Sequence, residues 1–390
     1  MSMDFLEAVE AQLIAATERG IRRRRWRWPW LMRVRLPWRA PTVGIAAGVG
    51  TALAASALAA TLTLPASKPK VQATTTTAVS IPRSYTTAGP VPARFQPESF
   101  TAISEFTWWL LGTAPCGAHA CTTVVQTITG GTRFTRIPGP PTTQVSNLRF
   151  ADGSNGYAYG QQLWSTHDDG ATWTQLHLGS SIGDLAIADG YVYAIVFDNG
   201  QARLMRSAVT ADAWIQLKAV TPGALSGLWV QGTSVFIQSG SQLLVSGDQG
   251  NHFGPVGGVR DAGNCSYDGG TLALWALCST GMAPDQVLLS TNSGNTFTAA
   301  AQVPDSPIDA FGAASGAVAV AAGQGPLFRT ADGGGTWARV RAPSGDWTYV
   351  GFSDPTHGVA IGIFGSGVHQ HSALYYTTDA GVSYHRVPIR

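Results

Sequence analysis

The sequence predicts an all-β body made of seven four-stranded sheets, preceded by an N-terminal cytoplasmic helix and one transmembrane helix. Three observations carry this prediction. Charged residues make up only 12% of the 390 residues and glycine is abundant, which is typical of short strands joined by tight turns. A turn motif recurs at regular intervals over residues 98–390. An uncharged segment at residues 42–64 precedes that body.

Residues 1–41 are expected to form a cytoplasmic amphipathic helix and an Arg/Trp-rich juxtamembrane segment. Leu6, Val9 and Leu13 fall on one helical face, and Gly20 can end the helix. This region has nine Arg against four acidic residues, and subtracting its +5 from the overall +2 leaves −3 for the remainder. Because the body is mildly acidic, no nucleic-acid partner is expected.

Residues 42–64 are predicted to cross the membrane as a helix. At about 1.5 Å per residue they reach about 34 Å, which exceeds a hydrocarbon core of about 30 Å. The denser positive charge precedes the segment, so the N-terminus is expected in the cytoplasm and the remainder outside. Membrane lipid is the expected partner of residues 22–64, where Arg and Trp alternate before the span. A cleaved signal peptide is the alternative, although its charged region would be unusually long.

Residues 65–97 are rich in Thr, Pro and Ala and are expected to form an extended linker. All four cysteines follow this linker, in a compartment where disulfides persist. Their spacing favours the local pairs Cys116–Cys121 and Cys265–Cys278. Zinc is the less favoured reading, because the spacing is wrong for a zinc site.

The body, residues 98–390, carries a repeated motif of Ser or Thr, then Asp or Asn, then Gly, then an aromatic residue. The five complete copies are Thr166, Asp168, Gly170 and Trp173; Ser246, Asp248, Gly250 and Phe253; Ser290, Asn292, Gly294 and Phe297; Thr330, Asp332, Gly334 and Trp337; and Thr377, Asp379, Gly381 and Tyr384. Degraded copies begin at Thr127 and Ser207, so successive copies are 39 to 47 residues apart. A repeat of this size with four apolar runs per unit predicts a seven-bladed β-propeller.

The chemistry of the motif suits a structural turn. The carboxylate can accept backbone N–H bonds, the glycine supplies a backbone shape that other residues resist, and the aromatic ring can pack between blades. Burial of that ring contributes about 2–3 kcal/mol. Calcium capture by an Asp-rich loop is the alternative reading.

The motif resembles the Asp box, or BNR repeat, of sialidases and other propellers. That resemblance implies that the boxes lie at the blade periphery as scaffold. It also implies that a sialidase would need three arginines, a tyrosine nucleophile assisted by glutamate, and an aspartic acid. The Arg-Ile-Pro signature at 136–138 follows the first degraded box instead of preceding it, and Glu98 and Glu105 are the glutamates beyond the predicted span. No catalytic residue is therefore assigned.

Seven-bladed Asp-box propellers also include photosystem II assembly factors, which bind a protein, but their arginine-rich face is not apparent here.

Loops between strands 2 and 3, and between blades, are expected to open onto one ligand face. Ring closure would bring His119 of blade 1 near His369 and His371 of blade 7. A His-x-His pair on an extended segment suits a metal, and exposed loop histidines are the alternative. Further candidates near the starts of inner strands are Arg149, Arg260, Asp309, Asp346 and Trp347. No metal or cofactor is assigned.

These observations predict a single-pass cell-membrane protein that displays an extracytoplasmic propeller. Its expected role is recognition or scaffolding of a protein or glycan ligand. The first alternative is a sialidase-like glycoside hydrolase, and the second is a transmembrane sensor that signals through residues 1–40.

Overall fold

The computed structural model describes residues 84–390 apart from 219–224, 232, 241, 257–263, 271–272, 280–283 and 305–306. The predicted cytoplasmic helix, the predicted transmembrane helix and most of the 65–97 linker lie outside the described residues. No helix in the described part of the chain is long and apolar enough to cross a membrane.

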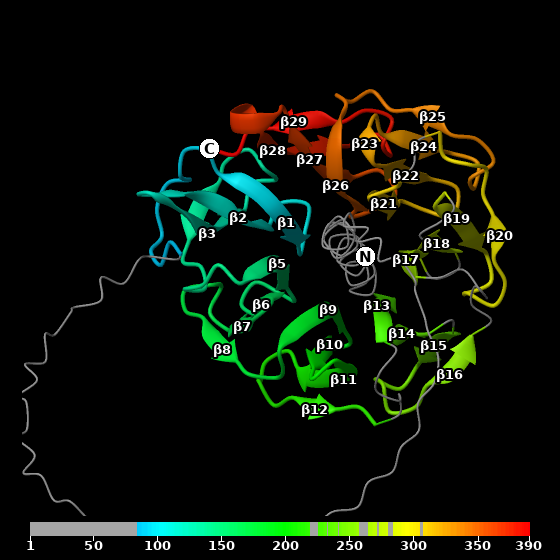
Figure 1. Ribbon diagram of the computed structural model, residues 1–390, viewed down its shortest axis with the longest axis horizontal. Coiled ribbons are helices and arrows are strands. Elements are labelled where there is room, and N and C mark those ends of the chain that lie inside the picture. Colours follow the sequence, from blue (N-terminus) through cyan, green and yellow to red (C-terminus); the bar gives the residue numbers. More distant parts are fainter. Residues whose placement is uncertain are drawn as a thin grey trace, which may run out of the picture. The chain divides into compact units, whose positions relative to one another are not determined.

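The described chain folds into seven antiparallel sheets arranged as blades around a ring (Figure 1). Blade 1 holds β1 (Gln96–Ala102), β2 (Trp108–Cys116), β3 (His119–Thr127) and β4 (Thr135–Ile137). Blade 2 holds β5 (Val145–Phe150), β6 (Gly156–Gly160), β7 (Leu163–Thr166) and β8 (Thr174–Leu176). Blade 3 holds β9 (Ser181–Ala188), β10 (Tyr191–Asp198), β11 (Gln201–Ala208) and β12 (Ile215–Gln216). Blade 4 holds β13 (Leu225–Gln231), β14 (Ser234–Ser239), β15 (Gln242–Ser246) and β16 (Gly254–Val256).

Blade 5 holds β17 (Asn264–Gly270), β18 (Ala273–Ser279), β19 (Gln286–Ser290) and β20 (Thr298–Ala299). Blade 6 holds β21 (Ala310–Ala313), β22 (Ala319–Ala322), β24 (Phe328–Thr330) and β25 (Ala338–Arg339). Blade 7 holds β26 (Gly345–Phe352), β27 (Gly358–Phe364), β28 (His371–Thr377) and β29 (His385–Val387), and the short β23 (Gln324–Gly325) adds to β26. A 3-10 turn, η1 (Gly367–His369), precedes β28. The prediction of a seven-bladed propeller of four-stranded blades is confirmed.

Each pair of neighbouring blades encloses its own apolar cluster, because each sheet is covered on both faces. This explains strands such as β10, whose run Tyr-Val-Tyr-Ala-Ile-Val-Phe is apolar on both sides. Between blades 1 and 2, Trp109 stacks on Phe150 with ring centroids 4.1 Å apart. Between blades 5 and 6, Trp275 packs against Phe311. Side-chain packing between sheets therefore holds the ring together.

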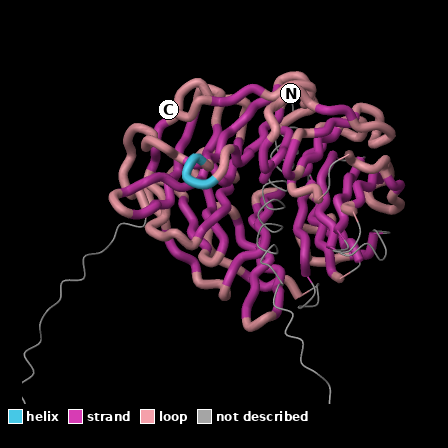
Figure 2. The backbone as a smooth tube through the Cα atoms, turned by 45° about the horizontal axis from the view of Figure 1, so that its top comes forward, coloured by secondary structure: helices cyan, strands magenta, loops and turns pink. Residues whose placement is uncertain are grey.

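The ring closes between blades 7 and 1 without exchange of a strand, since the blade 1 sheet holds β1 to β4 and the blade 7 sheet holds β26 to β29 with β23 added from the blade 6 segment. The rings of Phe100 and Tyr349 lie 6.4 Å apart in the apolar cluster at this junction. The Phe134 backbone N–H donates to the Arg390 carbonyl at 3.4 Å. Figure 2 shows the same arrangement of strands from a tilted direction.

The repeated motif forms the turn between the third and fourth strands, and its polar atoms bond within the turn. In blade 2, Gly170 N–H donates to Thr166 Oγ1 at 2.9 Å, and Thr166 Oγ1 donates to Asp168 Oδ1 at 2.9 Å. Thr172 N–H donates to the same carboxylate oxygen at 2.8 Å, and Gly170 has a φ of 79°. Blades 4, 5, 6 and 7 repeat these three bonds.

The two degraded copies differ from one another. In blade 1, Thr129 replaces the Asp, and its hydroxyl oxygen still accepts the Arg133 N–H at 3.1 Å. In blade 3, the Ser207 hydroxyl donates instead to the Ala211 carbonyl, so the turn lacks the usual Asp-centred bonds.

Both predicted disulfides are confirmed. Cys116 of β2 is bonded to Cys121 of β3, and Cys265 of β17 is bonded to Cys278 of β18. Cys265 and Cys278 are direct register partners in their sheet, so this bond joins two adjacent strands.

Candidate ligand-binding site

The antiparallel order of each blade separates two faces. Strand 2–3 loops and blade-to-blade connections emerge on one face, here called the loop face. Strand 1–2 turns and the Asp-motif turns emerge on the opposite one, here called the turn face. The motif residues are therefore separated from the loop face by the length of a strand, about 3.3 Å per residue.

A groove of about 490 Å³ lies at the outer edge of blade 1, beside β4, and reaches the strand 2–3 loop at Pro115. Its lining residues are Tyr85, Pro90, Val91, Pro92, Ala93, Arg94, Pro115 and Arg136. The wall at 84–95 leads into β1 and pairs with the blade: Gly89 and Arg136 exchange backbone hydrogen bonds of 2.9 and 2.8 Å. The end of the stretch that composition assigned to the linker thus belongs to blade 1.

The Arg136 guanidinium is held in place within this groove. It lies over the Tyr85 ring at 4.3 Å from the centroid, and its Nε–H donates to the Thr87 carbonyl at 3.0 Å. A Cβ on Gly89 would come within 2.7 Å of Arg136 Nη2, so a side chain at this position would displace the guanidinium. The Tyr85 hydroxyl donates to the Pro115 carbonyl at 2.6 Å and ties the wall to the disulfide loop.

Arg94 occupies a turn in which the Phe95 N–H donates to the Pro92 carbonyl at 3.3 Å. Its φ of 63° is left-handed, which costs a non-glycine residue roughly 1–3 kcal/mol. The Arg94 side chain is exposed. Among the described residues, no Asp or Glu forms a salt bridge with Arg94 or Arg136.

The loop of blade 7 borders the same junction. It contains η1, where the His369 N–H donates to the Ser366 carbonyl at 3.2 Å, yet Val368 is 96% exposed. Gln96 connects this loop to the groove: its Nε2 donates to the Arg94 carbonyl at 3.1 Å, and its Oε1 accepts the Ser372 N–H. The two loops therefore flank one junction.

The three predicted histidines all lie on loop-face segments of blades 1 and 7. His119 begins β3 and is exposed, and His369 ends η1. His371 begins β28, with Nδ1 3.2 Å from the His369 carbonyl oxygen and its ring 6.1 Å from that of Phe364. In the described residues, no group of three or more His, Cys, Asp or Glu side chains is arranged to hold a metal ion.

The remaining candidates do not gather there. Trp347 is fully buried and its Nε1–H donates to the Gly325 carbonyl at 3.1 Å, and Arg149 is 1% exposed and donates to the Tyr159 hydroxyl at 3.2 Å. Both side chains belong to the packing between blades and not to an exposed ligand face, because inner-strand side chains are covered by the next sheet. Asp309 and Asp346 are half-buried near the starts of β21 and β26. Arg260 lies outside the described residues.

Sequence reasoning missed the groove residues Tyr85, Gly89 and Arg94. Composition placed them in a linker rich in Thr and Pro, and Arg136 was considered only as part of Arg-Ile-Pro. The available signal was the pair of aromatic residues, Tyr85 and Phe95, in a stretch otherwise poor in residues that pack.

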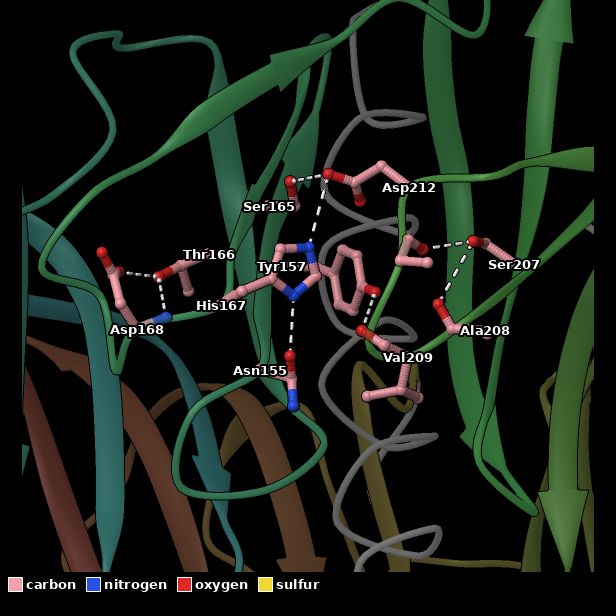
Figure 3. A network of polar contacts seen from close by, with 11 residues as sticks. Asn155, Tyr157, Ser165, Thr166, His167, Asp168, Ser207, Ala208, Val209 and Asp212 are labelled. Carbon is pink, nitrogen blue, oxygen red and sulfur yellow. Dashed lines mark hydrogen bonds and ion pairs between the residues drawn. The ribbon is translucent and has the colours of Figure 1, made fainter.

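A second polar cluster lies on the turn face between blades 2 and 3 (Figure 3). Ser165, which is 1% exposed, donates to Asp212 Oδ2 at 2.8 Å. His167 Nε2 lies 3.4 Å from the same oxygen, and Nδ1 lies 2.7 Å from Asn155 Oδ1. Because Ser165 bonds to the carboxylate and not to the imidazole, the cluster lacks the nucleophile–base contact of a catalytic triad.

Tyr157 completes this contact between the two blades. Its hydroxyl donates to the Val209 carbonyl at 3.0 Å, and its ring meets Trp214 edge-on. Burial, followed by the charges of Asp212 and Asp152, raises the pKa of Tyr157 above its ordinary value. The phenol therefore stays protonated and serves as a hydrogen-bond donor between the blades.

Comparison with known proteins places the fold. No family model matches the chain, and no curated protein matches it. Among solved structures, the chain is similar to YCF48 bound to D1 peptide, with 20% identity, 70% of this chain and 93% of that chain covered, and a TM-score of 0.50. It is also similar to YCF48 from Cyanidioschyzon merolae, with 14% identity, 75% and 98% covered, and a TM-score of 0.53. These similarities support the class of protein that the sheets define, a β-propeller.

Proposed function

We propose that this chain is a membrane-anchored, extracytoplasmic propeller that binds a protein ligand on its loop face at blades 1 and 7. The observation that carries the proposal is Val368, an apolar side chain that is 96% exposed on a hydrogen-bonded loop, and Gln96 connects this loop to Arg94 of the groove. Ordered loops on a rigid scaffold are where binding residues concentrate. YCF48, a similar fold, is bound to a peptide, so the fold is compatible with such a role.

A protein ligand suits the groove better than a glycan does. Its walls include Pro90, Pro92 and Pro115, which lack backbone N–H groups. Sugar recognition requires several hydrogen-bonding groups for hydroxyls, and the Tyr85 hydroxyl is already bonded to Pro115. A ligand with apolar and charged side chains matches this lining.

A sialidase-like activity receives less support. Of the arginines in the described residues, Arg149 is the one on an innermost strand, and it is buried against Tyr159. A carboxylate clamp of three arginines around the axis is therefore not formed by the described inner strands. The Ser165–Asp212–His167 cluster lacks a nucleophile–base contact.

The membrane anchor rests on residues 22–64, and both disulfides fit an oxidising compartment. Residues 1–40 would then lie in the cytoplasm and could carry a signal as the second alternative. Protease added to intact cells should degrade the propeller and leave a fragment that contains residues 1–64. Full protection of the propeller would contradict this topology.

The binding proposal is tested by photo-crosslinking the full chain in the membranes of cells that produce it. A photoreactive amino acid replaces Val368 in one variant, and replaces Ile215, which is 52% exposed on β12 of blade 3, in the control. A discrete protein adduct from position 368 and none from position 215 is the expected result. Equal adducts from both positions, or none from position 368, would overturn the proposal.

A further inference from the structure

We infer that the groove at blade 1 binds a short acidic segment of the protein ligand, with Arg94 and Arg136 contacting its carboxylates. The inference rests on the proposed function, and it names the chemistry that this part of the loop face selects.

Arg136 is preorganised for a carboxylate. Stacking on Tyr85 and the bond from Nε to Thr87 fix the plane of its guanidinium. These contacts employ one of its five N–H donors, so donors on the terminal nitrogens remain for a ligand. A guanidinium group held in one plane matches the geometry of a carboxylate, and the arginine side chain loses little conformational freedom when the ligand binds.

Arg94 stands at a position where the backbone disfavours a non-glycine residue. The left-handed φ of 63° suits Gly or Asn, and an exposed arginine adds no packing that would offset the strain. Strained residues cluster at binding and catalytic sites. Together with Arg136, Arg94 gives the groove two positive charges that no described carboxylate neutralises in a salt bridge.

The surroundings favour a peptide over other anions. Nucleic acid needs a broad basic surface, but residues 42–390 carry a net charge of −3, the overall +2 less the +5 of residues 1–41. The groove offers two guanidinium groups between proline, valine and alanine walls, which suits carboxylates set among apolar side chains. Val368 lies across the same junction and can contact an apolar side chain of the ligand.

The test uses the full chain in non-ionic detergent and a fluorescein-labelled heptapeptide of Ala, Pro and two Glu. Its counterpart carries Gln in place of both Glu, and fluorescence anisotropy measures Kd. The Glu peptide should bind about 10-fold more tightly than the Gln peptide, and the difference should shrink as salt is added. Arg94→Gln and Arg136→Gln should each weaken binding of the Glu peptide about 5-fold.

Three further variants separate binding from folding. Arg133→Gln changes an exposed arginine in the strand 3–4 turn of blade 1, on the turn face, and should leave Kd unchanged. Arg94→Gly should weaken binding while Tm holds or rises, because it relieves the left-handed backbone. Gly89→Ala should weaken binding by displacing the Arg136 guanidinium.

Equal binding of the Glu and Gln peptides would overturn the inference, as would an equal loss in Arg133→Gln. Binding of phosphatidylglycerol vesicles through the two arginines, without binding of the Glu peptide, would also overturn it in favour of a lipid. If the Val368 cross-link stands while the Glu peptide fails, only the acidic-ligand inference is lost. If the cross-link fails as well, the proposed function is lost too.

Discussion

The Asp212 carboxylate of blade 3 accepts the hydroxyl hydrogen of Ser165 in blade 2 at 2.8 Å. This bond crosses the boundary between two sheets, whereas the Asp-motif carboxylates of blades 2, 4, 6 and 7 bond within their own turns. Blade 3 lacks the Asp-centred turn, and its carboxylate stabilises the contact with its neighbour instead.

Replacing Asp212 by Ala should therefore destabilise the propeller. Ser165 is 1% exposed, and the loss of its acceptor should lower the free energy of unfolding by about 1–3 kcal/mol. Urea unfolding followed by tryptophan fluorescence measures this. Asp198→Ala is the control, since it breaks a more exposed ion pair with Arg203 and should cost less than about 1 kcal/mol. Equal losses in the two variants would contradict the cross-blade role.

Asparagine should replace aspartate in the motif turns at a smaller cost than alanine does. In blade 5, Asn292 Oδ1 accepts the Ser290 hydroxyl and the Thr296 N–H, each at 2.9 Å. Asp379→Asn in blade 7 should thus lower the free energy of unfolding by less than Asp379→Ala, which should cost about 1–2 kcal/mol. Thermal unfolding of both variants decides the matter, and a similar Tm for Ala and Asn would refute it.

Acid should destabilise the propeller through the same turns. The Thr336 backbone N–H and hydroxyl lower the pKa of Asp332 from 3.8 to about 2, and the Thr172 hydroxyl lowers that of Asp168. A depressed native pKa contributes stability above the unfolded pKa, and that contribution disappears as pH falls through the native value. Tm should fall between about pH 4 and pH 2, and less steeply in the Asp168→Asn, Asp332→Asn double variant. Identical slopes would contradict the assignment.

Removing the disulfides should have unequal effects. The loop closed by Cys265 and Cys278 spans 13 residues, and that closed by Cys116 and Cys121 spans five. Chain-entropy arguments give losses of about 3 and about 2 kcal/mol for the respective paired Ala variants. Denaturant unfolding of both variants tests this order, and a larger loss for the shorter loop would reverse it.

The blades were predictable because each needs a turn of fixed chemistry at a fixed interval. The motif at Thr166 and its later copies marks the third-to-fourth-strand turn, and the alternation of apolar runs supplies the strands. That blades 1 and 7 are adjacent could be predicted from closure of the ring alone. The local sequence pattern thus predicts the sheets, and closure of the ring predicts which loops lie next to each other.

The side chains on the loop face were harder to predict. Trp347 lies near the start of β26, but the sequence does not show that the adjoining blade covers it. Tyr85 and Arg94 stand in a stretch with linker composition, and backbone pairing of Tyr85 and Gly89 with distant residues places this stretch on blade 1. A neighbouring sheet buries Trp347, and pairing between distant segments places Tyr85. Both depend on the closed ring, so a local sequence pattern does not predict them.

Four consecutive strands build blade 1, and four build blade 7, so neither sheet lends a strand to the other. Except for β23, which lies in the blade 6 segment and pairs with β26 of blade 7, each blade is consequently a continuous genetic module. Apart from the loss of β23 from the blade 7 sheet when blade 6 is deleted, a duplicated or deleted module would leave every remaining sheet whole, and the altered blade number would have to be absorbed by the angles between sheets. A circularly permuted chain cut in the connection before Val145 would likewise keep all seven sheets intact, provided that a linker joined the old ends.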